Sequence, residues 1–406
     1  MTTAKGYTEM KDSGIQWIGA IPAHWDILRG KNVLRLLERP VKPEDDVVTC
    51  FRDGEVTLRK NRREEGFTNS LKEIGYQGIE PGDLIVHGMD GFAGAIGISD
   101  SRGKASPVLN VMDSNQNKRY LMYYLRAMAY KDVFMALSTG IRVRSCDLRW
   151  NKLSVFPFLI PKSHEQSAIA AYLDTQCAKI DEIIAQAKAS IEDYKQWKAS
   201  IIYEAVTKGL NPNVEMKDSG IEWIGRMPVH WTAPALKHLC TMQAGKNLIS
   251  EQISTSGQYP VYGGNGQRGY YSDYNANGNF LLVGRQGALC GNVHYVSGKF
   301  WATEHAVVTT PSKITNIRYL YYLLIAMDLN QYASNSAAQP GLSVGNILTV
   351  KTLLPPIGEQ VRISEFLDNG CPKIDEVITE KQSLIDDLES YKKSLIYEVV
   401  TGKRRV

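Results

Sequence analysis

The chain has 406 residues, of which 43% are hydrophobic and 22% are charged, and its formal net charge is +4. This composition is typical of globular proteins, and the length predicts two to three domains, each with its own core. No apolar run reaches the length of a membrane span and the first residues lack the apolar core of a signal peptide, so we expect a cytoplasmic protein. The mild positive charge permits a nucleic-acid partner without requiring one. The six cysteines stand singly, which favours buried thiols over a zinc site or a disulfide framework.

A sixteen-residue segment near the N-terminus occurs twice. MKDSGIQWIGAIPAHW at residues 10–25 returns as MKDSGIEWIGRMPVHW at residues 216–231, with twelve identical positions. The Gly and Pro residues of this doubled motif exclude a continuous helix, and its Ile and Trp residues are large apolar anchors. We expect a loop with a short turn that fixes the start of each half of the chain against a helix. A docking face for a partner is the functional hypothesis, and simple internal packing is the alternative.

A body of variable sequence follows each copy of the motif. Short β-like runs bounded by turn residues occur at residues 46–50, 83–87, 279–283 and 293–296. Both bodies also contain a related helix-like segment, at residues 119–128 and 318–327. The bodies are therefore predicted to share a scaffold and to differ in their loops, as a pair of recognition modules would.

Each body is followed by a long helical segment with a narrow apolar stripe. Residues 165–210 and residues 359–406 align without a gap, and their apolar residues recur at steps of three and four. We expect a short helix followed by a long one in each copy, because Asn369, Gly370 and Pro372 interrupt the second copy. A lone helix of this length is marginal in water, so the two copies are predicted to pack on each other as an antiparallel coiled coil. The alternative is that each stripe packs on its own neighbouring body.

These elements predict an α+β fold: two globular α/β bodies separated by two long antiparallel helices, with a pseudo-two-fold internal duplication. The predicted segments are residues 1–162 (motif and first body), 163–210 (first helical region), 211–358 (repeated motif and second body) and 359–406 (second helical region).

Catalytic motifs are absent from the sequence, whereas groups suited to DNA are present. There is no GxxxxGK[ST] loop, no HExxH and no GxSxG. The candidates for phosphate contact in the first body are Arg59, Lys60, Arg62, Arg63, Arg102, Lys104, Arg142 and Arg144, with His87 at a strand end. A solvated charged face is the alternative for such a cluster.

The second body contains a glycine-rich polar loop at residues 259–271. Its glycines allow close backbone approach, and its polar side chains carry donors that suit base edges. The candidates are Asn265, Gln267, Arg268 and Tyr270, joined by Arg285 and Gln286 after the next strand-like run. A plain hairpin turn is the alternative. The candidates for partner docking are aromatic: Trp17, Trp25, Trp223 and Trp231 in the doubled motif, and Trp197 and Tyr391 in the helices.

Three features together resemble one family over the whole chain. They are the doubled DSGIxWIGxxPxHW motif, the doubled helix with its Glu-Gln, Leu-Asp and Lys-Ile-Asp-Glu elements, and the Val-Tyr-Gly-Gly-Asn-Gly loop that starts at Val261. They resemble the specificity subunit of type I restriction-modification enzymes. The rival hypothesis is a self-sufficient DNA methyltransferase or nuclease with an unrecognised site.

The resemblance implies a non-catalytic subunit of a complex that cuts DNA and methylates adenine. Two target recognition domains would each take one half of a split, asymmetric site on double-stranded DNA. The helices would act as a spacer and seat two methyltransferase subunits, which a restriction subunit joins. S-adenosylmethionine, ATP and Mg²⁺ are expected on those partners, and no cofactor is expected on this chain.

Overall fold

The computed structural model describes residues 6–62, 73–136, 148–287, 289–333 and 341–406. The chain divides into two compact units: unit 1 holds Met1–Ala187 and Ser383–Val406, and unit 2 holds Lys188–Gln382. Each unit therefore contains one copy of the doubled motif, one body and a segment of both long helices. The four-segment division of the chain stays a prediction, because the compact units divide each long helix between them.

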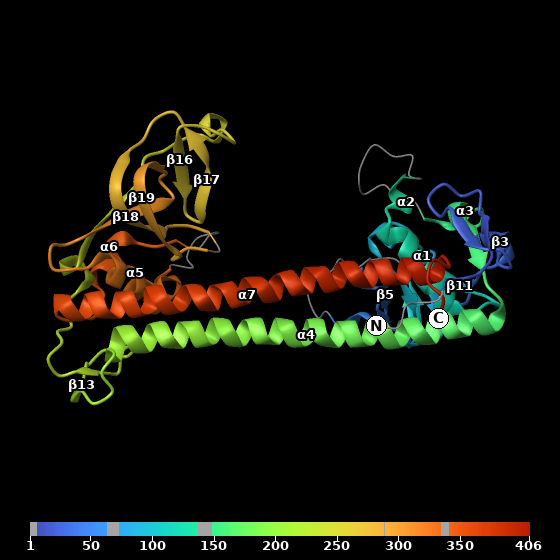
Figure 1. Cartoon of the computed structure of the whole chain (residues 1–406), viewed down its shortest axis with the longest axis horizontal. Helices are drawn as coiled ribbons and strands as arrows, with labels where there is room; N and C mark the ends of the chain where they lie inside the picture. Colours follow the sequence, from blue (N-terminus) through green and yellow to red (C-terminus); the bar gives the residue numbers. More distant parts are fainter. Residues whose placement is uncertain (1–5, 63–72, 137–147, 288, 334–340) are drawn as a thin grey trace. The chain divides into compact units, whose positions relative to one another are not determined.

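The two long helices are α4 (Ser163–Lys208) and α7 (Ile357–Val400). In unit 2, Lys198 Nζ lies 2.7 Å from Asp375 Oδ2. Tyr194 lies one turn earlier on α4, and its ring contacts Lys381, which lies later on α7. Partner numbers thus run in opposite directions, so the helix segments of this unit are antiparallel (Figure 1). In unit 1, Lys392 Nζ lies 2.6 Å from Asp181 Oδ2. The predicted α+β class and the predicted pair of long helices are confirmed.

The ends of the long helices also pack on the bodies, as the alternative hypothesis proposed. In unit 2, Val206 of α4 and Leu367 of α7 are fully buried in one core with Tyr319 and Leu320 of the body. In unit 1, Ile169 and Leu173 of α4 are buried. Helix pairing and helix-on-body packing therefore occur in the same unit, at different positions along each helix.

The predicted break in the second helical segment is wrong. α7 continues through Pro372, and α4 is equally unbroken. Pro372 is exposed, whereas its neighbours Cys371 and Ile374 are buried. The apolar face therefore holds the helix together on the side away from the proline ring, and this packing outweighs the missing backbone hydrogen bond.

The first body is built from short antiparallel strands beside helix α1 (Lys118–Tyr130). Its main sheet has the order β4 (Arg35–Leu36), β11 (Leu109–Asp113), β8 (Leu84–His87), β9 (Ile96–Ile98). Three strand pairs accompany it: β10 (Gly103–Ala105) with β7 (Gln77–Ile79), β5 (Val48–Cys50) with β6 (Val56–Leu58), and β12 (Pro157–Ile160) with β3 (Asp26–Arg29). Two short helices, α2 (Val133–Ala136) and α3 (Trp150–Leu153), complete the described part.

The second body is built on one six-stranded sheet. Its order is β15 (Cys240–Ala244), β20 (Ala306–Pro311), β18 (Ala276–Gly284), β19 (Val293–Ala302), β16 (Tyr259–Gly263), β17 (Gly266–Tyr271). The β16–β19 pair is parallel and the others are antiparallel. Helices α5 (Ile317–Ala326) and α6 (Val344–Thr349) pack beside it. The predicted strands and the related helices α1 and α5 are confirmed, whereas the sheets of the two bodies differ.

Each copy of the doubled motif forms a two-stranded hairpin instead of the expected loop. The strand pairs are β1 (Met10–Asp12) with β2 (Ala20–Pro22) and β13 (Met216–Asp218) with β14 (Arg226–Pro228). The connecting turns contain Gly14, Gly19, Gly220 and Gly225, all at positive φ. The glycines that argued against a helix therefore form the turn of a hairpin.

Candidate functional site

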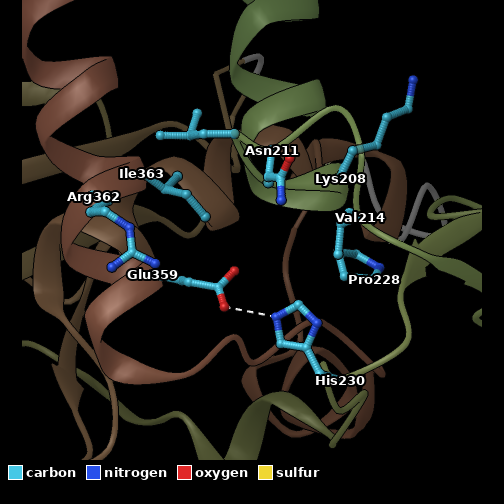
Figure 2. A pocket seen from close by; sticks show the side chains of 10 residues that line it. Lys208, Asn211, Val214, Pro228, His230, Glu359, Arg362 and Ile363 are labelled. Atoms are coloured by element: carbon cyan, nitrogen blue, oxygen red, sulfur yellow. Dashed lines mark hydrogen bonds and ion pairs between the residues drawn. The ribbon is translucent and has the colours of Figure 1, made fainter.

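The first turn of each long helix holds the His-Trp end of the doubled motif. In unit 2, His230 Nε2 lies 2.7 Å from Glu359 Oε1 (Figure 2). Trp231 Nε1 donates to Glu359 Oε2 at 3.0 Å. In unit 1, His24 Nε2 lies 2.9 Å from Glu165 Oε2. We call His24–Glu165 and His230–Glu359 the anchor pairs. Sequence analysis missed them, although each residue occurs in both copies of its repeat.

The residue after each anchor glutamate connects the long helix to the body. Gln166 Oε1 accepts from Asn117 N at 2.9 Å, and Gln166 Nε2 donates to Pro161 O at 2.9 Å. The copy in unit 2 is the same: Gln360 accepts from Asn316 N and donates to Pro355 O, both at 2.8 Å. Asn117 and Asn316 are the N-caps of α1 and α5. The Glu-Gln pair therefore fixes both the motif and the helix of the body.

Nine residues after each anchor glutamate, an aspartate of the long helix binds an Arg and a Tyr of the body. Tyr123 Oη and Tyr322 Oη donate to Asp174 and Asp368 at 2.8 and 2.7 Å. Arg318 Nε donates to the Asp368 carboxylate at 3.0 Å. Burial by itself would raise the pKa of Asp368, but the hydrogen bonds from Arg318 and Tyr322 outweigh it, so this pKa is lowered.

The far end of each long helix contacts the other side of the motif. Tyr397 Oη of α7 donates to Trp17 O at 2.8 Å in unit 1, and Tyr203 Oη of α4 donates to Trp223 O at 2.9 Å in unit 2. Each hairpin is thus held between the start of one long helix and the end of the other. The expectation that each motif fixes its half of the chain against a helix agrees with these contacts.

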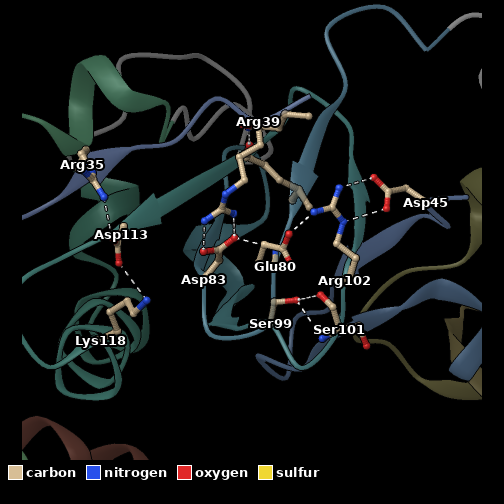
Figure 3. Close-up of polar contacts among 12 residues, drawn as sticks. Arg35, Arg39, Asp45, Glu80, Asp83, Ser99, Ser101, Arg102, Asp113 and Lys118 are labelled. Carbon is tan, nitrogen blue, oxygen red and sulfur yellow. Dashed lines mark hydrogen bonds and ion pairs between the residues drawn. The ribbon is translucent and has the colours of Figure 1, made fainter. Parts of the chain in front are cut away.

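Among the described residues, four of the five basic candidates of the first body are paired with carboxylates, and Figure 3 shows this for Arg102. Arg102 donates to Asp45 through Nε at 2.9 Å and Nη2 at 3.0 Å, and it also contacts Glu80. These bonds lower the pKa of the buried Asp45 carboxyl. A guanidinium that is held by two carboxylates adds little net charge toward a phosphate.

Other basic candidates of the first body are paired in the same way. Lys60 Nζ lies 2.5 Å from Asp46 Oδ2, Lys104 Nζ 2.7 Å from Glu73 Oε1, and Arg62 Nη1 2.7 Å from Asp53 Oδ2. Arg59 Nε lies 3.5 Å from Thr49 Oγ1. Arg63, Arg142 and Arg144 lie outside the described residues.

His87 has a structural role at its strand end. Its Nδ1 accepts from the backbone N–H of Asp90 at 2.9 Å and of Met89 at 3.2 Å, which shapes the turn after β8. Burial lowers the pKa of His87, so the neutral ring is favoured. A neutral ring whose Nδ1 is already occupied contributes no fixed positive charge toward a phosphate.

The second body gathers four of its six predicted residues around one hollow. A hollow of about 430 Å³ is lined by Asn265, Gln267 and Arg268 of the β16–β17 hairpin, by Gln286 after β18, and by His305 before β20. His305 Nε2 lies 3.2 Å from Glu304 Oε1. His305 was not among the predicted residues, because its place beside the hairpin depends on the β18–β20 pairing.

Glycine is required where the hairpin meets β18. A side chain on Gly284 would place its Cβ 2.2 Å from Gly264 O, and Gly266 has a φ of +97°. The loop backbone can therefore lie directly on the strand end, which brings the loop side chains beside Gln286. Arg285 does not line the hollow, and its backbone N–H donates to His305 O at 2.9 Å. The Tyr270 backbone pairs with Ser254.

The aromatic docking candidates differ in exposure. Trp25 and Trp231 are 0% and 1% exposed, so these rings pack in the core and do not offer a docking surface. Trp17 and Trp223 are half-buried, and Trp17 stacks on Phe156. On the helices, Trp197 is 54% exposed and Tyr391 is 48% exposed. The exposed helix aromatics are therefore the candidates that remain open to a partner.

Two further properties concern the described part of the chain. None of its helices is both long enough and apolar enough to span a membrane. It also contains no group of three His, Cys, Asp or Glu residues placed to hold a metal ion. Five of the cysteines are buried free thiols, and Cys146 lies outside the described residues.

Comparison with known proteins supplies independent findings. Residues 228–384 match the family model described as type I restriction modification DNA specificity domain. The chain is 47% identical over 137 residues to the type I restriction enzyme EcoprrI specificity subunit of Escherichia coli, which covers 33% of this chain and 34% of that protein. It is 22% identical over 422 residues to the putative type I restriction enzyme MjaX specificity subunit of Methanocaldococcus jannaschii, with 96% of each chain covered.

A solved structure gives the same assignment at the level of the fold. Its chain comes from work on complex assembly and conformational transition of the type I R-M system. The TM-score is 0.70 at 14% identity, with 94% of this chain and 98% of that chain covered. Residues 228–384 thus match a type I restriction modification DNA specificity domain, and the chain as a whole is similar to type I restriction enzyme specificity subunits and shares the fold of a chain from a type I R-M system.

Proposed function

We propose that this chain is the DNA sequence-recognition subunit of a type I restriction-modification complex. Each body reads one half of a bipartite, asymmetric site, and the long helices dock methyltransferase subunits. The observation that carries the proposal is that the contacts at the start of each long helix occur twice. Equivalent Glu, Gln and Asp residues hold two bodies whose sheets differ. The same contacts thus fix two bodies of different structure to the long helices. This arrangement suits a protein that recognises two different DNA sequences, one with each body.

In the second body, the hollow is the proposed base-reading surface. Asn and Gln amides match adenine edges, and Arg matches guanine, so Asn265, Gln286 and Arg268 offer the side-chain types that read the major groove. The groups come from two chain segments, so several side chains can meet neighbouring base pairs together. Each well-formed bidentate contact would add about 1–3 kcal/mol of discrimination.

In the first body, phosphate contact requires a rearrangement of ion pairs. Lys60 and Arg62 lie at the surface with exposed carboxylate partners, which for Arg62 are Asp53 and Glu55. Such exposed pairs contribute only about 0–1 kcal/mol each, whereas Arg102 is held by the buried Asp45. Exchange of a carboxylate for a phosphate is therefore inexpensive at these two positions. We propose Lys60 and Arg62 as phosphate contacts, together with Arg63, Arg142 and Arg144, and we assign Arg102 to the support of the fold.

Partner docking is proposed at the exposed helix aromatics. Trp197 and Tyr391 belong to the residue types that dominate the energetics of protein interfaces. Methyltransferase subunits bound there would bring S-adenosylmethionine to the DNA, and restriction subunits would bring ATP and Mg²⁺. In this proposal the chain itself stays non-catalytic.

Selection of randomised DNA duplexes tests the proposal. The chain is purified with its methyltransferase subunits, bound duplexes are sequenced, and a split, asymmetric consensus is expected. Labelled S-adenosylmethionine provides the second measurement: methyl transfer to DNA is expected only when the methyltransferase subunits are present. Methyl transfer or DNA cleavage by the purified chain alone would contradict the proposal and favour a self-sufficient enzyme.

A further inference from the structure

The internal duplication places equivalent positions of the two repeats in different environments. In unit 1, Tyr7 precedes the first copy of the motif, and its ring centroid lies 5.8 Å from those of His24 and Trp25. Tyr7 Oη lies 3.4 Å from Glu165 Oε1, and the Arg405 guanidinium lies 5.8 Å from the centre of the ring. A phenol ring therefore contacts the anchor pair of unit 1 at Glu165 and is flanked by an arginine, while the His24 side chain stays 40% exposed.

In unit 2, the corresponding place is open. The residue at the position of Tyr7 relative to the second motif is Asn213, which is exposed, and its N–H donates to Asn211 Oδ1 at 3.0 Å. A hollow of about 280 Å³ lies over the anchor pair instead, with His230 and Glu359 in its lining (Figure 2). The two units therefore share the anchor pair and differ in whether a phenol ring contacts its glutamate.

The lining of this hollow has the same chemistry that surrounds Tyr7. The His230 ring and Pro228 offer flat surfaces to an aromatic ring, and the Glu359 carboxylate offers an acceptor to a hydroxyl. Arg362 also lines the hollow, and among the described residues no acceptor pairs with its guanidinium. A guanidinium beside an aromatic ring is stabilising, as Arg405 beside Tyr7 illustrates.

The size of the hollow limits what it can take. Sites for drug-sized ligands have volumes of roughly 300–1,000 Å³, so a hollow of about 280 Å³ accommodates one side chain more readily than a nucleotide cofactor. Ile363, Val214 and Leu210 add apolar lining beside the polar groups of Lys208, Glu359 and Arg362, which suits a ring that carries a polar group. A phenol satisfies both the apolar lining and the carboxylate acceptor.

We propose that this hollow of unit 2 binds the side chain of a tyrosine from a partner polypeptide. The ring lies against His230, its hydroxyl donates to Glu359, and Arg362 flanks the ring. The inference rests on the proposed function only for the source of the tyrosine, which would be another subunit of the complex. This tyrosine site would be a second partner contact beside the exposed helix aromatics, and it would exist in unit 2 only.

The test uses the full chain, selectively ¹³C-labelled at histidine, and N-acetyl-L-tyrosinamide as the probe. Addition of the probe should shift the His230 ring resonance in a saturable manner and shift the His24 resonance less, because Tyr7 already contacts the carboxylate of the first anchor pair. In Tyr7→Ala both resonances should respond. In Asn213→Tyr the response of His230 should disappear, because the new ring can fill the hollow from within.

Two comparisons define specificity. N-acetyl-L-leucinamide should leave His230 unchanged at the same concentration. Arg362→Ala should weaken the binding of the tyrosine probe about two- to fivefold, as expected for the loss of an exposed cation–π contact of about 0.5–1 kcal/mol. Arg362 and Asn213 are exposed, so these variants are expected to fold. Thermal unfolding of each variant checks this.

Three outcomes would overturn the inference. The first is an unresponsive His230 in the native chain while His24 responds in Tyr7→Ala. The second is an equal response to the leucine probe, which would make the hollow a general apolar site. The third is displacement of the tyrosine probe by adenosine monophosphate, which would assign the hollow to a nucleobase. The titration contains neither DNA nor a partner subunit, so it can fail while the proposed function holds, and the proposed function can fail while the titration succeeds.

Discussion

Glu165 and Glu359 each connect a long helix to one copy of the doubled motif. Each carboxylate lies in the first turn of a long helix, where negative charge is favourable, and each accepts from the histidine of the doubled motif. Glu359 also accepts from the buried Trp231 indole. Loss of this carboxylate would leave a buried N–H without an acceptor, which is expensive because the indole cannot turn to water.

Glu359→Ala is therefore expected to lower the free energy of unfolding by about 1–3 kcal/mol. Arg362→Ala, on the same face of α7 but without a protein acceptor among the described residues, should change it by less than about 0.5 kcal/mol. Urea unfolding followed by tryptophan fluorescence measures both. Equal values for the two variants would show that the anchor pair does not stabilise unit 2.

The Arg102–Asp45 pair predicts a dependence of stability on pH. Arg102 lowers the pKa of Asp45 in the folded chain, so the stabilisation is present above the unfolded pKa of about 3.9 and is lost as pH falls through the lower folded value. Arg102→Ala should therefore be less stable than the native chain at pH 7, and the difference should shrink below about pH 4. Urea unfolding midpoints from pH 2 to 7 measure the difference.

Arg35→Ala is the matched control for that experiment, because Arg35 is largely exposed in its pair with Asp113. It should have a much smaller effect at every pH. A constant difference between Arg102→Ala and the native chain from pH 2 to 7 would assign the effect to packing of the arginine stem and not to the ion pair.

Arg268 supplies the residue-scale test of base reading. Arg268→Ala should relax the sequence preference in one half-site only, at a cost of about 1–3 kcal/mol for the affected base pair. Arg62→Ala, a proposed phosphate contact, should weaken binding to all sequences alike and reduce its dependence on salt. Binding to a panel of single-base variants distinguishes the two. Uniform weakening by Arg268→Ala would make Arg268 a phosphate contact.

Among the elements, α7 shows that packing can override a local break signal. A proline inside a helix removes one hydrogen bond and crowds the preceding turn. Its ring faces solvent here, while Leu367, Cys371 and Ile374 bury the opposite face. The turn before the proline is also held from outside, because Asp368 binds Arg318 and Tyr322.

Pro372→Ala is expected to raise the free energy of unfolding by about 1–3 kcal/mol, because alanine restores the missing backbone hydrogen bond. Lys373→Ala, at the next exposed position, should have an effect within about 0.5 kcal/mol. Chemical denaturation provides the measurement. A destabilised Pro372→Ala chain would mean that the proline itself is needed to place Leu367 and Cys371 in the core.

At the scale of the whole molecule, the proposed spacer role gives the sharpest prediction. If the long helices set the separation of the half-sites, removal of seven residues from both, within 178–200 and the aligned part of α7, should change the permitted gap between the half-sites or abolish binding. The bases that are read should stay the same. Binding to a series of duplexes with different gaps tests this, and an unchanged gap preference would remove the spacer role.

The sequence by itself determined the duplicated plan, the long helices, the main strands and the resemblance to type I restriction-modification specificity subunits. These follow from local periodicity and from repeats, which are visible without any long-range contact. The anchor pairs could also have been predicted, since a histidine and a glutamate each recur in both repeats.

Only the tertiary structure decided which polar and aromatic side chains are free to contact DNA or a partner. It paired Arg102 and Lys104 with carboxylates, buried Trp25 and Trp231, and brought His305 beside the β16–β17 hairpin. It also carried α7 through Pro372. The physical reason is the same in each case: the free energy of a charge, a ring or a helix turn depends on neighbours that are distant in the sequence, and only the folded chain brings them into contact.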